Sequence, residues 1–319
     1  MGIARPVIAA VVVVAALAAL PQSSATQTSD LQPTLDEFYP ADRLKPATAA
    51  DRQSCSATLA ASGTSQPAVV LAAYTSRSAG ALRLLRRTGA GPFQVAFDSP
   101  DGWAMPGGRC AIRLRDVDFD GQPEAFVSFQ SVRASTGWIF KWDGTTLRNL
   151  TPTESSEGRV SSLLLDPALY DLDHQGPLEL IAARTVERQV PGTRSTSPAY
   201  VYGLTEAGFA VQGSVIAVIG YRADVDARSN LRSFRLIEDS AAPYRLRVVN
   251  GDRFGKRRVT GATILVNEVP VLEPRDLSDA MAFASVTIPQ LAVQNHVTAT
   301  LTGPADGTLL VLIEDSTKR

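Results

Sequence analysis

A segment that recurs every 55 or 56 residues constrains this chain more than any other feature. Ala68, Glu124 and Glu179 occupy the same position relative to an apolar run in three successive segments. The intervals between these positions are 56 and 55 residues. A period of this length is typical of stacked supersecondary units such as propeller blades. In each unit a first apolar run is followed by two more, which predicts an inner strand and then a hairpin.

Three units follow this order along the chain. Their apolar segments are 66–71, 81–85 and 93–97, then 122–127, 138–142 and Leu147, then 177–181, 200–202 and 208–211. Propellers usually have four or more blades, and a fourth start near Val215–Tyr221 lacks the pattern. The sequence therefore predicts a partial or small β-propeller-like region.

The segments outside the repeats divide the rest of the chain. Residues 26–61 contain Pro33, Pro40 and Pro46 among small polar residues and are expected to form a linker or arm, and the repeats are assigned to 62–230. From 231 to 319 short alternating runs such as Tyr244–Val248 are separated by turn residues at intervals typical of a β-sandwich. The predicted fold class is all-β, with the repeat region followed by a sandwich.

Residues 1–25 have the three parts of a secretory signal. Arg5 precedes an apolar run of 14 residues, Val7–Leu20, and small residues lie before a cut after Ala25. The alternative is a retained membrane anchor, but a spanning helix needs about 20 apolar residues. We expect a secreted, periplasmic or cell-surface protein with no membrane span after cleavage.

Composition limits the partners and the covalent links. Basic and acidic residues number 31 and 32, so no strongly basic face is implied and nucleic acid is not an expected partner. Cys55 and Cys110 are the two cysteines. In an oxidising compartment an even count favours one disulfide, with two separate buried thiols as the alternative.

The loop Asp116–Glu124 carries the strongest chemical signal. Asp116, Asp118 and Asp120 alternate, Gly121 follows, and Glu124 is the ninth residue. In a tight turn these carboxylates converge, and hard oxygen ligands at such offsets are those that Ca²⁺ takes. An EF-hand is excluded because its twelfth position, here Val127, must be acidic. The alternative is a solvated acidic turn without an ion.

A second loop, Asp171–Glu179, repeats the frame. Asp171, Asp173 and Glu179 occupy the same offsets as three of the acids in the first loop, and Gln175 replaces the fourth. With one negative charge fewer, this loop is expected to bind Ca²⁺ more weakly. The first unit has no acids at these positions and should be free of metal.

The two acidic loops, each followed by an apolar strand, resemble the FG-GAP/VCBS-type repeats of exported bacterial proteins and integrin-like propellers. The resemblance covers residues 62–222 and implies structural Ca²⁺ at Asp116, Asp118, Asp120 and Glu124. It extends to Asp171, Asp173 and Glu179, with Gln175 departing from the pattern. Residues 240–315 more loosely resemble an Ig-like sandwich tail.

Two functions remain open. His174 and His296 are the only histidines and no Gly-x-Ser-x-Gly elbow occurs, so a non-catalytic binding protein with a protein or glycan ligand is preferred. The alternative is a secreted hydrolase of carbohydrate or phosphate esters, because two distant carboxylates would suffice for a glycosidase. Trp103, Trp138 and Trp142 are candidates for a binding groove, or for packing between strands.

Overall fold

The described part of the chain excludes its first 31 residues. A computed structural model describes residues 32–60, 68–89, 91–100, 105, 107–130, 135–152, 164–184, 199–224, 231–236 and 242–315. The predicted signal peptide, the start of the first apolar segment (66–67) and Trp103 lie outside these residues. Within them, no helix has the length and apolar character needed to cross a membrane.

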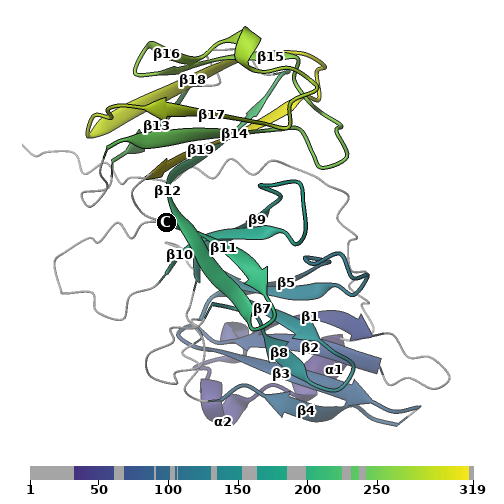
Figure 1. Ribbon diagram of the computed structural model, residues 1–319. Coiled ribbons are helices and arrows are strands. Elements are labelled where there is room, and N and C mark those ends of the chain that lie inside the picture. The colour runs from purple at the N-terminus through teal and green to yellow at the C-terminus, as the bar shows by residue number, and fades with distance from the viewer. Residues whose placement is uncertain are drawn as a thin grey trace, which may run out of the picture.

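The fold is all-β, as the sequence predicted, and each repeat is a four-stranded antiparallel unit (Figure 1). The first unit contains β1 (Gln53–Ala60), β2 (Ala68–Thr75), β3 (Gly80–Arg87) and β4 (Gln94–Asp98). The second contains β5 (Arg109–Arg115), β6 (Glu124–Gln130), β7 (Ser135–Trp142) and β8 (Leu147–Asn149). The third contains β9 (Leu164–Tyr170), β10 (Glu179–Arg184), β11 (Ala199–Thr205) and β12 (Gly208–Arg222).

The segments predicted from the repeat are the second, third and fourth strands of each unit. The first strands, β1, β5 and β9, were not predicted as members of the units. In β5, arginines alternate with Cys110, Ile112 and Leu114, and no residue of that strand is fully buried. Strands without a buried apolar run give little signal at the level of sequence.

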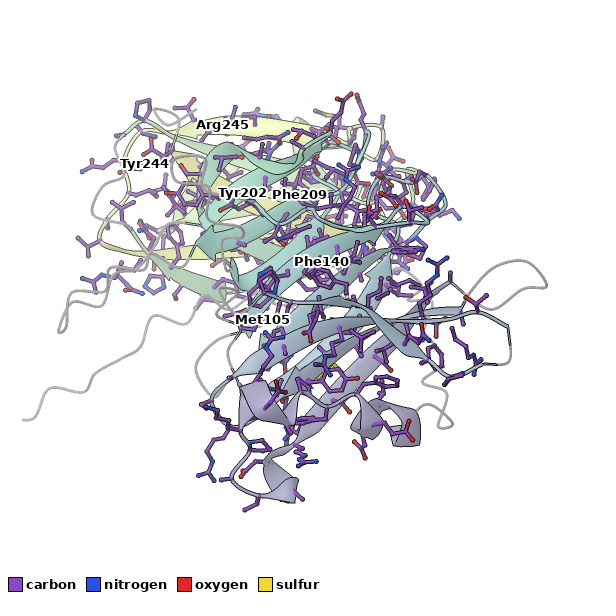
Figure 2. All side chains as sticks on the ribbon, turned by 90° about the horizontal axis from the view of Figure 1, so that it is seen from below. Met105, Phe140, Tyr202, Phe209, Tyr244 and Arg245 are labelled. Atoms are coloured by element: carbon purple, nitrogen blue, oxygen red, sulfur yellow. A yellow bond between two sulfur atoms is a disulfide. The ribbon has the colours of Figure 1, made fainter. Side chains whose placement is uncertain are left out.

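Successive units pack against each other through buried side chains, and β7 of the second unit also pairs with β9 of the third, so these two units share one sheet. Val69 and Leu82 of the first unit share a buried cluster with Phe129 and Trp138 of the second. A further cluster joins Ile139 of the second unit to residues of β10 and β11 in the third. In Figure 2 the labelled side chains follow this order, from Met105 through Phe140 and Tyr202 to Tyr244.

A two-sheet sandwich forms the next layer. One sheet contains β14 (Tyr244–Asn250), β17 (Phe283–Ile288), β19 (Thr308–Asp315) and the end of β12, and the other contains β13 (Leu231–Arg235), β15 (Gly261–Val266), β16 (Val269–Leu272) and β18 (Gln294–Thr302). Residues from both sheets, including Leu246, Val248, Ile264 and Val297, form one core. The predicted sandwich is thus present, together with a 3₁₀ turn at Pro274–Asp276.

Strand β12 lies within the predicted repeat region, 62–230, but its second half belongs to a sheet of the sandwich. Its first half pairs with β11, and Val215–Arg222 pairs with β19 of the sandwich. The segment Val215–Tyr221 is therefore not the start of a fourth unit. It continues the third unit into the sandwich sheet, as the long strand in Figure 1 shows.

The segment expected to be a linker is built into the fold from Gln32 onward. It contains α1 (Gln32–Glu37), α2 (Ala41–Leu44), a 3₁₀ turn (Ala49–Asp51) and β1. Leu35, Tyr39 and Leu44 are buried against one face of the first unit. The Tyr39 hydroxyl also donates a hydrogen bond of 2.9 Å to the Thr75 carbonyl. A short helix needs such packing to be stable. The buried residues Leu35, Tyr39 and Leu44 lie among many small polar residues, so the composition of the segment did not predict that it packs against the first unit.

Cys55 and Cys110 form the predicted disulfide, with Cα atoms 5.9 Å apart. Cys55 belongs to β1 in the first unit and Cys110 to β5 in the second, so the bond joins two separate sheets.

Candidate functional site

Both acidic loops connect the first strand of a unit to its second strand. Asp116 follows the end of β5 and Glu124 begins β6, and in the same way Asp171 follows β9 and Glu179 begins β10. The backbones match as well, since the fourth residues, Phe119 and His174, have φ of 59° and 57°. The sixth residue is a glycine with positive φ in both loops, which fits a tight turn that few other residues adopt.

The ninth residue of each loop is a buried carboxylate that holds the loop closed. Glu124 is 0% exposed and Glu179 is 6% exposed. Glu124 Oε2 accepts a hydrogen bond of 2.7 Å from Val117 N–H, and Glu179 Oε2 accepts the equivalent bond of 2.7 Å from Leu172 N–H. Burial raises the pKa of Glu124, and it raises the pKa of Glu179 to about 7 against the opposing effect of the Leu172 N–H.

The remaining acids converge as the sequence predicted. Asp116, Asp118 and Asp120 place oxygen atoms within 4.8 Å of one another, and Asp171, Asp173 and Glu179 do the same. Two acidic clusters that could hold a metal ion are therefore present. Glu124 is not a member of the first cluster, although it faces a side chain that two of its members also contact.

Several of these oxygens are buried without a hydrogen-bond partner. They are Asp116 Oδ1, Asp118 Oδ1 and Glu124 Oε1 in the first loop and Asp171 Oδ1 in the second. A buried carboxylate oxygen without a partner is costly, and a cation relieves that cost. Each loop therefore has the oxygen ligands of a hard cation, and in each at least one of them lacks a hydrogen-bond partner.

Lys141 is a member of the first loop's site that the sequence analysis missed. Its ammonium Nζ lies 2.5 Å from Asp118 Oδ2, 2.8 Å from Asp120 Oδ2 and 2.9 Å from Glu124 Oε1, and the side chain is only 15% exposed. These three carboxylates raise the pKa of Lys141 against the effect of burial. The signal in the sequence was a lysine inside the apolar run Trp138–Trp142.

Arg253 is a second cation that the sequence analysis missed, and it comes from the sandwich. Its Nε donates a hydrogen bond of 2.7 Å to Asp171 Oδ2, and its guanidinium donates one of 3.2 Å to the Gly176 carbonyl. The guanidinium carbon also lies 3.8 Å from the centre of the Phe119 ring. Arg253 thus contacts both acidic loops at once.

The loops lie at the contacts between successive layers. Leu178 N–H donates a hydrogen bond of 2.7 Å to the Val117 carbonyl, which ties the first loop to the third unit. Leu172 of the second loop packs against Val249 and Leu310 of the sandwich. The two loops are therefore positioned to influence how the layers fit together.

His174 lies in the contact between the second loop and the sandwich. It is half-buried, and its ring lies 4.8 Å from the Phe283 ring of β17 in the sandwich. Burial lowers the pKa of His174, with the Asp171 carboxylate acting in the opposite direction. Its position in the layer contact accounts for the residue without a catalytic role.

The aromatic residues and the second histidine give little support to a groove or a triad. Trp138 and Trp142 are buried between strands at 2% and 9% exposure, which favours packing for both. His296 Nδ1 lies 2.8 Å from Ser233 Oγ on the surface of the sandwich. Among the described residues no carboxylate bonds to the other nitrogen of His296, so the third member of a triad is missing there.

A pocket of about 330 Å³ lies where β11 and β12 meet the sandwich sheet. Its lining includes Tyr244 and Arg245, labelled in Figure 2, and the acids Glu314 and Asp315. Arg245 and Arg247 both form ion pairs with Glu314, so the charge of this acid is neutralised within the fold.

Comparisons with known proteins do not assign a family. No family model matches the chain, and no curated protein matches it either. Among solved structures, it is similar to an exo-β-1,3-galactanase from Phanerochaete chrysosporium with galactose, at 11% identity and a TM-score of 0.19, over 76% of this chain and 78% of that one. It is also similar to a fructofuranosidase from Schwanniomyces occidentalis with fructose, at 8% identity and a TM-score of 0.21, over 78% and 70%. TM-scores this low carry no argument about function.

Proposed function

We propose that the chain is an exported, non-catalytic binding protein whose layers are held in register by cations in its acidic loops, with Ca²⁺ in the Asp171 loop. The observation that carries the proposal is the position of this loop. Asp171, Asp173 and Glu179 converge at the contact between the third unit and the sandwich, where Leu172 and His174 pack against sandwich residues. An ion there would stabilise a layer contact and would take no part in a reaction.

The donor set of the Asp171 loop fits Ca²⁺. All of its candidate ligands are carboxylate oxygens, and Ca²⁺ takes six to eight oxygens in flexible geometry. Arg253 pairs with only one oxygen of Asp171, and no lysine or arginine among the described residues forms an ion pair with Asp173 or Glu179. Among the described residues, Arg253 is therefore the one ion-paired cation for the three acidic side chains of this loop. An extracytoplasmic location would supply Ca²⁺ at concentrations that suit a modest site.

Calorimetric titration of the mature chain with Ca²⁺ tests this proposal. We expect binding in the range of extracellular modules, a dissociation constant of about 10⁻⁴–10⁻³ M, with a matching rise in the thermal midpoint. Asp173→Asn should weaken binding at least about tenfold, because it removes one ligand charge. The exposed Asp306 lies outside both loops, so Asp306→Asn is the matched control and should bind as the wild type does. The absence of Ca²⁺-dependent heat and thermal shift in the wild type would refute the metal claim.

A secreted hydrolase remains the second candidate, and the pocket beside the sandwich favours it. Glu314 and Asp315 are both at least 94% buried and both line that pocket. The names of the similar structures agree with this candidate better than with a non-catalytic protein, although they add no weight. A panel of glycoside and phosphate-ester substrates tests it: turnover that Asp315→Asn abolishes and Asp306→Asn preserves would replace the first proposal with this one.

A further inference from the structure

We infer that Lys141 is a built-in cation that takes the place of a metal ion in the Asp116 loop, so that only the Asp171 loop demands a divalent ion. The inference deepens the proposed function and rests on it for the Asp171 loop alone. The number of acids predicted weaker Ca²⁺ binding at the Asp171 loop than at the Asp116 loop, and this inference reverses that order of affinity.

The contacts of Lys141 carry the first step. An ammonium group has three protons to donate, and Nζ lies within 2.9 Å of an oxygen on each of three carboxylates, Asp118, Asp120 and Glu124. Its positive charge is thus shared among three of the acids that the resemblance assigns to Ca²⁺. A divalent ion bound to the same acids would lie close to this positive charge, and the repulsion would weaken its binding.

The strand register carries the second step. In the second unit Ala125 is opposite Phe140, which places Lys141 beside Glu124. In the third unit Leu180 is opposite Tyr202, so the equivalent residue beside Glu179 is Gly203. The neighbouring strand therefore supplies a cation to the first loop and none to the second.

The space at Gly203 shows why the third unit cannot simply acquire a lysine. A Cβ atom built on Gly203 would lie 1.9 Å from Nε2 of the Gln212 side chain. Gln212 occupies the place from which a lysine at this position would start. Introducing a lysine therefore requires Gln212 to be shortened as well.

Three oxygens of the first loop could still favour a metal ion. Asp116 Oδ1, Asp118 Oδ1 and Glu124 Oε1 have no hydrogen-bond partner, although Lys141 Nζ lies 2.9 Å from Glu124 Oε1. If these three oxygens were sufficient to hold a cation, the wild type would bind an ion in each loop. The number of Ca²⁺ ions bound per chain therefore decides between the alternatives.

The experiment compares Ca²⁺ stoichiometry by calorimetry and native mass spectrometry in the wild type, Lys141→Gln and Lys141→Arg. We expect one ion in the wild type, two in Lys141→Gln and one in Lys141→Arg, which keeps the positive charge. The thermal midpoint of Lys141→Gln should fall in EDTA and recover in Ca²⁺. Two ions in the wild type, or no additional ion in Lys141→Gln, overturns the inference.

A reciprocal variant tests the same idea in the other loop. Gly203→Lys with Gln212→Ala should lose the ion that Gln212→Ala alone still binds, and retention of that ion counts against the inference. If the wild type binds no ion and Lys141→Gln binds one, the proposed Ca²⁺ site in the Asp171 loop fails while the role of Lys141 stands. Failure of Lys141→Gln to fold even in about 10 mM Ca²⁺, well above the weakest extracellular dissociation constants, also overturns it.

Discussion

At the scale of single residues, Glu179 is the group whose charge state most affects the second acidic loop. Its folded pKa of about 7 lies above the ordinary value of 4.5, chiefly because the side chain is buried. The folded state therefore holds the proton more tightly than the unfolded state does, and the associated stability is present below about pH 4.5 and lost as the pH rises through 7.

We predict that the metal-free protein loses stability between about pH 4.5 and 7, and that Glu179→Gln flattens this part of the profile. The amide introduced by this substitution is neutral at every pH, so it cannot take part in the titration. Urea unfolding at several pH values in EDTA measures the effect. Glu206 is exposed on the same unit, and Glu206→Gln should leave the profile unchanged. An unchanged profile in Glu179→Gln would show that another group causes the loss.

Some contacts of the two acidic loops could be predicted from the sequence and others could not, depending on how far apart the two partners lie along the chain. The acids of each loop are close in sequence, so their offsets and the glycine at the sixth position were enough to predict that they converge. Lys141 is 23 residues from Asp118, and Arg253 is 82 residues from Asp171. Neither contact follows from a local pattern, because strand register and layer packing create them.

At the scale of elements, the disulfide is the one covalent link between two separate sheets in the described part of the chain. It joins β1 to β5 and closes a loop with a sequence separation of 55. A chain-entropy estimate for a loop of this length gives about 4 kcal/mol, and measured losses are typically 2–5 kcal/mol.

We predict that Cys55→Ala with Cys110→Ala lowers the free energy of unfolding by about 2–4 kcal/mol, because the unfolded chain regains the freedom of that loop. Denaturant unfolding measures the change. The oxidised wild type treated with a reductant should lose a similar amount, which separates the crosslink from the alanine side chains. A loss below about 0.5 kcal/mol in both would mean that the sheets hold together without the bond.

The strands themselves show what apolar periodicity can and cannot predict. Buried strands such as β2, in which every residue is buried, were evident from the sequence. Strand β5 is only partly buried, and β12 changes partner from β11 to β19 at Val215 without any break in the chain. A change of partner within one continuous strand leaves no mark on the period-two pattern, so apolar periodicity does not show where the sandwich sheet takes over from the third unit.

At the scale of the whole molecule, the sandwich occupies the place where a further repeat would pack. The first loop contacts the third unit through Val117, and the second loop contacts the sandwich through Leu172 in the same structural position. The second and third units are therefore each fastened to the next layer by the loop between their first two strands. Arg253 adds a contact that spans both loops, since it touches Asp171 and Phe119 together.

We predict that Arg253→Met destabilises the protein by about 2 kcal/mol in EDTA and by less than about 1 kcal/mol in saturating Ca²⁺. Removing one partner of a fully buried ion pair costs roughly 3–5 kcal/mol, and here the two side chains are 16% and 15% exposed, which reduces the loss. In EDTA the variant removes the ion pair of Asp171 with Arg253, whereas bound Ca²⁺ supplies a positive partner in its place. By thermodynamic linkage the variant should also bind Ca²⁺ more tightly than the wild type does.

Denaturant unfolding with and without Ca²⁺ measures both effects. The exposed Arg275, far from either loop in sequence, provides the control Arg275→Met. Equal losses in the two conditions would mean that Arg253 acts through its stacking on Phe119, and that Ca²⁺ at Asp171 does not share its role in holding the sandwich to the repeats.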